Sequence, residues 1–216
     1  MFEIVLLAMV AAFILLRLRS ELGKKTGNEP LPPFARQAPE GPNGHVIEGE
    51  TVPREAQDNI IDLTADPKLR RALEDIRRAD RSFDPAAFMD GAKSAYQMIL
   101  EAFWAGDRKT LQEFLDDQVY SQFEGAITAR EKNNYKLENR LLEIEKAELV
   151  GAQLVDGSAE LTVHFKAEVI AITRDQDGNV VEGDVSDAVE MNDKWTFARS
   201  TRSRDPNWTL VATRAA

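Results

Sequence analysis

The sequence predicts an α+β domain in which helices pack on one face of a curved antiparallel sheet. Apolar residues recur every three or four positions as far as about Tyr135, which is typical of helices. Beyond that residue they recur at every second position, which is typical of strands. Helices followed by a run of strands favour an α+β arrangement over an alternating α/β fold.

The longest expected helix spans residues 84–106. Asp84 suits the N-cap, Pro85 the first helical position and Gly106 the stop. Its wide apolar face predicts deep burial; it consists of Phe88, Ala92, Ala95, Ile99 and Phe103, with Tyr96, Leu100 and Trp104 beside them. Gly91 lowers helix propensity, and we expect another backbone to approach it closely.

Two shorter helices are expected next. Asp107 suits the cap of the first, which holds Leu111, Phe114 and Leu115. The second shows apolar residues at helical spacing, namely Val119, Tyr120, Phe123 and Ile127.

The strands begin near residue 142. Leu142, Ile144, Ala147 and Leu149 indicate one strand with a bulge. A turn at 156–157 leads into a strand with strict alternation from Leu161 to Ala171. The final hairpin, residues 193–213, holds one tryptophan in each strand, and we expect both to build the sheet face.

The N-terminal residues 1–23 predict a transmembrane anchor. No charge occurs from Ile4 to Leu16, and the stretch 2–18 spans roughly 25 Å as a helix, near the lower limit for crossing a bilayer. Basic residues follow the stretch and none precedes it, which favours an uncleaved anchor with the C-terminal part in the cytoplasm. A signal peptide and a peripheral helix remain alternatives.

Residues 24–65 predict a disordered linker, because they hold six prolines and no sustained apolar period. The following segment, 66–81, predicts a helix with Leu69, Ala72, Leu73 and Ile76 on one stripe. Its basic residues lie off that stripe, so the helix either packs as an ordinary surface helix or also lies on anionic lipid. The candidate lipid-binding residues are Lys68, Arg70, Arg71, Arg77, Arg78 and Arg81.

Composition and motifs argue against several function classes. A net charge of −10 argues against nucleic-acid binding, and the absence of cysteine excludes disulfides and thiolate chemistry. The sequence DQDGN, 175–179, resembles the first half of a calcium loop. It lacks the glycine that such a loop has at its sixth position, so we expect a plain turn. His164 faces away from the apolar set of its strand and is not expected to act as a base. We find no motif for a metal, a cofactor or catalysis and expect a non-enzyme.

Three stretches resemble the C-terminal domain of the TIM forty-four-like (Tim44-like) family. They are FDPAAFMDGAKSAYQMILEAFWAGDRKTLQEFLDDQVYSQFEGAI, RDQDGNVVEGD and DKWTFARS with NWTLVAT, and the likeness covers about residues 66–216. The family is named for the mitochondrial inner-membrane tether that docks the import motor's chaperone onto the translocon. The anchor and linker look like its short bacterial membrane-anchored branch, called TimA.

The resemblance implies a cone-shaped fold related to nuclear transport factor two, with an apolar pocket between helices and sheet. The pocket would be lined by Tyr96, Ile99, Phe103, Trp195, Phe197, Trp208 and Leu210. It also implies contact with anionic lipid, especially cardiolipin, through the start of the domain, which here is the basic helix. This chain lacks the tether's long N-terminal region, so the import-motor role itself is not carried over.

From these observations we expect a membrane-anchored, non-enzymatic adaptor at the bacterial inner membrane, linked to protein translocation or membrane-complex assembly. Its protein partner would be a heat-shock chaperone or a membrane complex. An alternative is a binder of an acyl chain or other small hydrophobic ligand in the pocket. A third hypothesis is an enzyme, which would need an acid–base pair inside the pocket.

Overall fold

A computed structural model describes residues 66–216 of the chain. The anchor expected at 1–23 and the linker expected at 24–65 lie outside these residues. Within 66–216, no helix is both long and apolar enough to span a membrane.

Within residues 66–216, four helices precede the strands, as the change of period predicts. They are α3 (Pro67–Ala79), α4 (Pro85–Ala105), α5 (Arg108–Phe114) and α6 (Asp117–Lys132). The caps expected for α4 are present, because the Asp84 side chain accepts the backbone N–H groups of Ala86 and Ala87 and Gly106 adopts a φ of 74°. Asp107 likewise caps α5 by accepting the Thr110 N–H at 3.1 Å.

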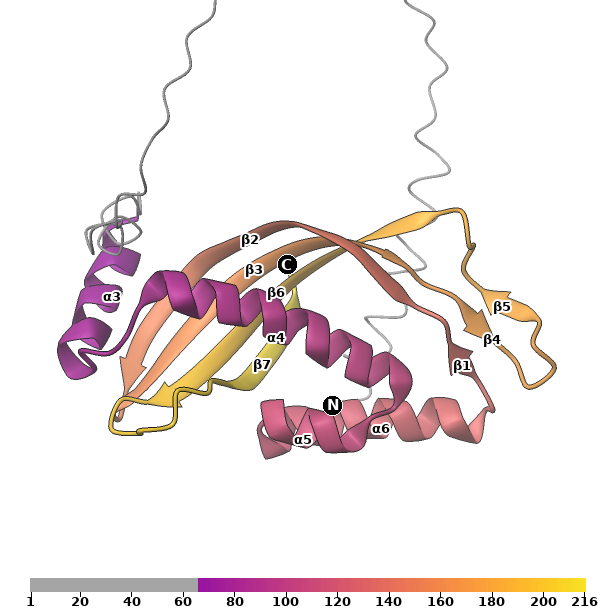
Figure 1. Cartoon of the computed structure of the whole chain (residues 1–216), viewed down its shortest axis with the longest axis horizontal. Helices are drawn as coiled ribbons and strands as arrows, with labels where there is room; N and C mark the ends of the chain where they lie inside the picture. The colour runs from indigo at the N-terminus through magenta and orange to yellow at the C-terminus, as the bar shows by residue number, and fades with distance from the viewer. Residues whose placement is uncertain (1–65) are drawn as a thin grey trace, which may run out of the picture. The chain divides into compact units, whose positions relative to one another are not determined.

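The main sheet has four antiparallel strands in the order β2-β3-β6-β7. They are β2 (Arg140–Val155), β3 (Ser158–Ile170), β6 (Ala188–Ser200) and β7 (Thr209–Ala215). A smaller sheet, in the order β1-β4-β5, joins β1 (Lys136–Leu137), β4 (Thr173–Arg174) and β5 (Val180–Glu182). The α+β class is therefore confirmed, and Figure 1 shows α4, α5 and α6 on the concave side of the curved main sheet.

The strands β2 and β3 are joined by a two-residue turn. Asp156 and Gly157 both have positive φ, 50° and 81°, as a type I′ hairpin turn requires. The expected bulge in β2 is present; the register shifts at three places, between Leu141 and Glu143, Ile144 and Lys146, and Leu149 and Gly151. The first shift turns Leu142 outward, contrary to the expected pattern, and leaves it 43% exposed.

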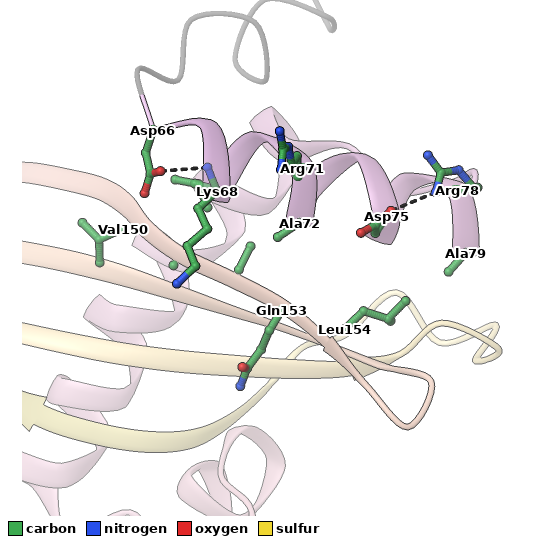
Figure 2. Close-up of a pocket in the computed structure, with 13 residues that line it drawn as sticks. Asp66, Lys68, Arg71, Ala72, Asp75, Arg78, Ala79, Val150, Gln153 and Leu154 are labelled. Carbon is green, nitrogen blue, oxygen red and sulfur yellow. Dashed lines mark hydrogen bonds and ion pairs between the residues drawn. The ribbon is translucent and has the colours of Figure 1, made fainter.

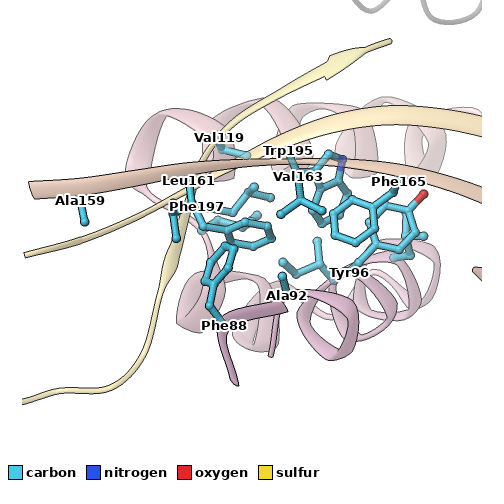
Figure 3. Close-up of a cluster of buried hydrophobic side chains, with 14 of the residues drawn as sticks. Phe88, Ala92, Tyr96, Val119, Ala159, Leu161, Val163, Phe165, Trp195 and Phe197 are labelled. Atoms are coloured by element: carbon cyan, nitrogen blue, oxygen red, sulfur yellow. The ribbon is translucent and has the colours of Figure 1, made fainter. Parts of the chain in front are cut away.

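The core lies between α4 and the main sheet. Tyr96 of α4 stacks on Phe165 of β3 with ring centroids 4.3 Å apart, and its centroid lies 4.6 Å from that of Trp195 in β6. Figure 3 shows these rings together with Phe88 and Phe197 in one cluster. The expectation for Gly91 is wrong, because it lies on the exposed side of α4 and a Cβ there would meet no atom within 4 Å.

Candidate functional site

Helix α3 presents an apolar stripe to the domain and a basic surface to solvent. Its N-cap, Asp66, accepts the Lys68 backbone N–H at 2.8 Å, and Pro67 occupies the first turn. Leu69, Leu73 and Ile76 are buried on the domain side, so the expected stripe is confirmed. The helix is therefore seated by hydrophobic contacts, which leaves its opposite side accessible.

The candidate lipid-binding residues differ in their surroundings. Lys68, Arg71, Arg77, Arg78 and Arg81 are exposed, whereas Arg70 is half-buried. Arg78 forms an exposed ion pair with Asp75 at 2.8 Å. Within residues 66–216, the side chains of Lys68 and Arg71 have no ion-pair partner. Figure 2 shows Arg71 and Arg78 projecting away from the strands, whereas Lys68 extends toward β2.

The C-terminal end of α3 is fastened to the sheet by one ion pair. The Arg199 guanidinium of β6 contacts the Asp80 carboxylate at 2.5 Å, and the two side chains are only 12% and 11% exposed. Burial acts to raise the pKa of Asp80, but hydrogen bonds from Ser82 and the charge of Arg199 together hold that pKa below its ordinary value. Arg199 also lies over the Trp208 ring, 4.8 Å from its centroid.

An open groove lies between α3 and strand β2, with a volume of about 800 Å³. Its helix side includes Lys68, Leu69, Ala72 and Arg78, and its strand side is the run of five residues 150–154. Figure 2 shows the two sides facing one another. This volume lies within the range of ordinary ligand-binding clefts.

The seven residues expected to line an apolar pocket lie in the packed core or at its margin. Tyr96, Ile99, Trp195, Phe197 and Leu210 are each at most 3% exposed. Phe103 contacts the Phe123 ring with centroids 5.1 Å apart, and Trp208 contacts Phe88 with centroids 4.8 Å apart. None of the seven lines the α3–β2 groove or a second, smaller hollow of about 300 Å³ beside α4 and α5.

A polar pair, buried Tyr96 with half-buried Asp193, lies at the margin of the core and has no counterpart among the residues expected from the sequence. The Tyr96 hydroxyl donates to Asp193 Oδ2 at 3.0 Å. Burial raises the pKa of Asp193, although the Tyr96 hydrogen bond and the nearby His164 act to lower it. Burial also raises the pKa of Tyr96, so the phenol stays protonated. The register of β6 places Asp193 opposite α4, and the sequence carries no signal for that register.

The comparison with known families gives one match over most of the described residues. The model of the Tim44-like domain matches residues 69–215, which include most of α3, the main sheet and the final hairpin. The chain belongs to the Tim44-like family. The family resemblance noted in the sequence is therefore confirmed.

Several curated proteins are similar to this Tim44-like chain. A probable mitochondrial import inner membrane translocase subunit of Caenorhabditis elegans is 25% identical over 67% of the chain and 35% of its own length. The human mitochondrial import inner membrane translocase subunit TIM44 is 23% identical over 80% of the chain and 39% of its own length. An uncharacterized protein of Rickettsia prowazekii is 26% identical over 64% of the chain and 56% of its own length. The matched region thus spans between about a third and somewhat over half of these relatives.

The similar solved structures include one from a chloroplast protein. This structure is the intermembrane space region of ARC6, with a TM-score of 0.44 and 11% identity over 59% of this chain and 95% of that one.

Proposed function

We propose that this chain is a membrane-anchored, non-enzymatic scaffold whose Tim44-like domain attaches to anionic lipid and recruits protein partners at a bacterial inner membrane. The observation that carries the proposal is the two-sided character of α3. Three apolar side chains seat the helix on the domain, and its outer side carries exposed basic residues. A basic surface of this kind suits a membrane rich in anionic headgroups such as cardiolipin.

The distribution of charge along the chain also favours α3 as the surface that faces the membrane. Residues 82–216 carry 15 basic and 24 acidic side chains, a net charge of −9. Between residues 68 and 81 there are six basic and three acidic side chains, a net charge of +3. An anionic membrane would repel most of the domain and attract α3, so the charges favour one face toward the lipid.

The relatives' names support the location and the class of role. Curated relatives are described as subunits of a mitochondrial inner membrane translocase. By analogy, the partner of this chain would be a chaperone or a subunit of a membrane complex. We place the first 23 residues across the membrane and the Tim44-like domain on the cytoplasmic side.

The test is binding of the compact unit 55–216 to vesicles containing cardiolipin, measured by co-sedimentation. Reversing the charge of Arg71, Arg78 and Arg81 to Glu should weaken binding on the order of 100-fold, because each basic residue near an anionic surface contributes about 1 kcal/mol. Circular dichroism would verify that the variant is folded.

A matched control reverses three exposed basic residues elsewhere, Lys109, Lys132 and Arg202. It changes the net charge equally but leaves α3 intact, so vesicle binding should stay close to that of the parent. Equal losses in both variants would reduce the effect to overall charge and refute a lipid face on α3.

A further inference from the structure

We infer that the groove between α3 and β2 binds an extended peptide from a partner protein, which adds as a strand to the edge of the main sheet. The occupant has acidic and aliphatic side chains. This inference deepens the proposed scaffold role and rests on it, because it names the kind of partner segment that the domain recruits.

The first step is that the groove reaches the sheet edge itself. Strand β2 is an outer strand of the main sheet, paired with β3 on one side only. Side chains of a strand point alternately to its two faces, so a cavity above one face would touch every second residue. The groove touches five consecutive residues, 150–154, and therefore runs along the edge.

The second step concerns the backbone groups that this edge offers. In a two-residue hairpin, the residues flanking the turn, Val155 and Ser158, form a hydrogen-bonded pair. Pairs alternate from there, so Leu154 opposite Ala159 and Ala152 opposite Leu161 are non-hydrogen-bonded pairs. The N–H and C=O groups of Ala152 and Leu154 consequently point away from β3, toward the groove.

The third step is that only this half of the edge lacks charge. Residues 143–148 include Glu143, Glu145, Lys146 and Glu148, and charges on an edge strand discourage pairing. Residues 150–155, with the sequence VGAQLV, carry none. Val150 and Leu154 are each 38% exposed, and the bulge before Gly151 interrupts regular pairing at the boundary between the halves.

The fourth step fixes the chemistry of the occupant. The lining contains three basic and two acidic residues, but Arg71 and Arg78 project away from the strands and Arg78 is paired with Asp75. The Lys68 ammonium extends toward β2 with no ion-pair partner among residues 66–216, so it can receive a carboxylate. Leu69, Ala72, Ala79, Val150 and Leu154 supply apolar contacts for aliphatic side chains.

The test measures fluorescence anisotropy of a labelled peptide of about seven residues, a typical strand length, with alternating Val and Asp. The full-length chain is held in neutral detergent, so anionic lipid plays no part. We expect saturable binding. The same peptide methylated on alternate backbone nitrogens should bind at least about tenfold more weakly. It keeps its side chains but loses the backbone N–H groups that would donate hydrogen bonds to β2.

Two variants of the chain sharpen the test. Ala152→Pro removes an N–H that points to the groove and should weaken binding about tenfold, since proline is tolerated where the N–H faces away from the neighbouring strand. Lys68→Glu should weaken binding of the Val–Asp peptide and strengthen binding of a peptide with alternating Val and Lys, relative to the parent chain. Lys132→Glu is the matched control and should change neither.

The outcomes separate this inference from the lipid role. Ala152→Pro should bind cardiolipin vesicles like the parent. The peptide experiment therefore tests strand addition even if the domain does not bind lipid, and the vesicle experiment tests lipid binding even if the peptide does not bind. Equal affinity for the methylated and unmethylated peptides, or no saturable binding, would overturn strand addition. Peptide binding that appears only after residues 55–65 are replaced by a Gly/Ser stretch would assign the groove to the chain's own preceding segment and overturn the partner assignment.

Discussion

The ion pair between Asp80 and Arg199 joins the end of α3 to strand β6 across 119 positions of sequence. Both side chains are mostly buried, and removing one partner of such a pair leaves the other charge without compensation. Arg199→Ala should therefore lower the free energy of unfolding by about 3 kcal/mol. In urea denaturation, the double variant Asp80→Ala/Arg199→Ala should lose less than the sum of the single losses; additive losses would show that the pair is not coupled.

The same pair has a defined pH dependence. The pKa of Asp80 is lower in the folded chain than in the unfolded chain. Its contribution to stability is therefore present above the unfolded value of about 3.9 and is lost as pH falls through the folded pKa.

Asp193 should show the opposite dependence. Burial raises its pKa in the folded chain, so the folded state binds a proton more readily than the unfolded state does. Acidification through the raised pKa should stabilise the parent relative to Asp193→Asn, which keeps an acceptor for the Tyr96 hydroxyl. Melting of the two proteins between about pH 7 and pH 4 measures this difference, and a difference that stays constant with pH would contradict the raised pKa of Asp193.

Helix α3 is attached to the domain mainly by three buried side chains. Leu73 is fully buried, so Leu73→Ala should cost about 2–5 kcal/mol if α3 unfolds together with the domain. Met98→Ala, at a side chain 41% exposed on α4, is the control and should cost far less. If Leu73→Ala leaves the main unfolding transition unchanged and only exposes α3 to proteases, the helix is an independent unit.

The elements that could be predicted from the sequence are those with local signals. Asp84, Pro85 and Gly106 mark the ends of α4, and alternation from Leu161 onward marks β3, because caps and periodicity act over a few residues. The sequence pattern predicts the wrong side for Leu142, because bulges change which residues face the core. The environment of Gly91 has no local signal, because helix propensity does not reveal what lies beside a glycine.

The candidate site could be predicted only in part, because only some of its features have a local signal in the sequence. The basic residues of α3 stand together in sequence, so their helix and its stripe were recognisable. The groove depends on how α3 lies along residues 150–154, and the Asp80–Arg199 pair depends on contacts between distant segments. Neither has a local pattern.

The whole molecule is strongly acidic, yet its candidate membrane face is basic. The proposed attachment to lipid should therefore be sensitive to ionic strength, because exposed charges are screened beyond about 10 Å at 0.1 M salt. Binding of the unit 55–216 to cardiolipin vesicles should accordingly weaken as salt rises from about 0.05 to 0.5 M. Binding that is independent of salt would indicate hydrophobic insertion in place of electrostatic attraction.

The proposed contact of α3 with the membrane can be measured directly, because the chain contains no cysteine. A single cysteine at the exposed position Glu74 of α3, or at the exposed position Gln122 of α6, would carry an environment-sensitive fluorophore on the unit 55–216. With vesicles of cardiolipin and brominated phosphatidylcholine, we predict a blue shift and bromine quenching at position 74 and neither at position 122. Equal quenching at both positions, or quenching at 122 alone, would contradict attachment through α3.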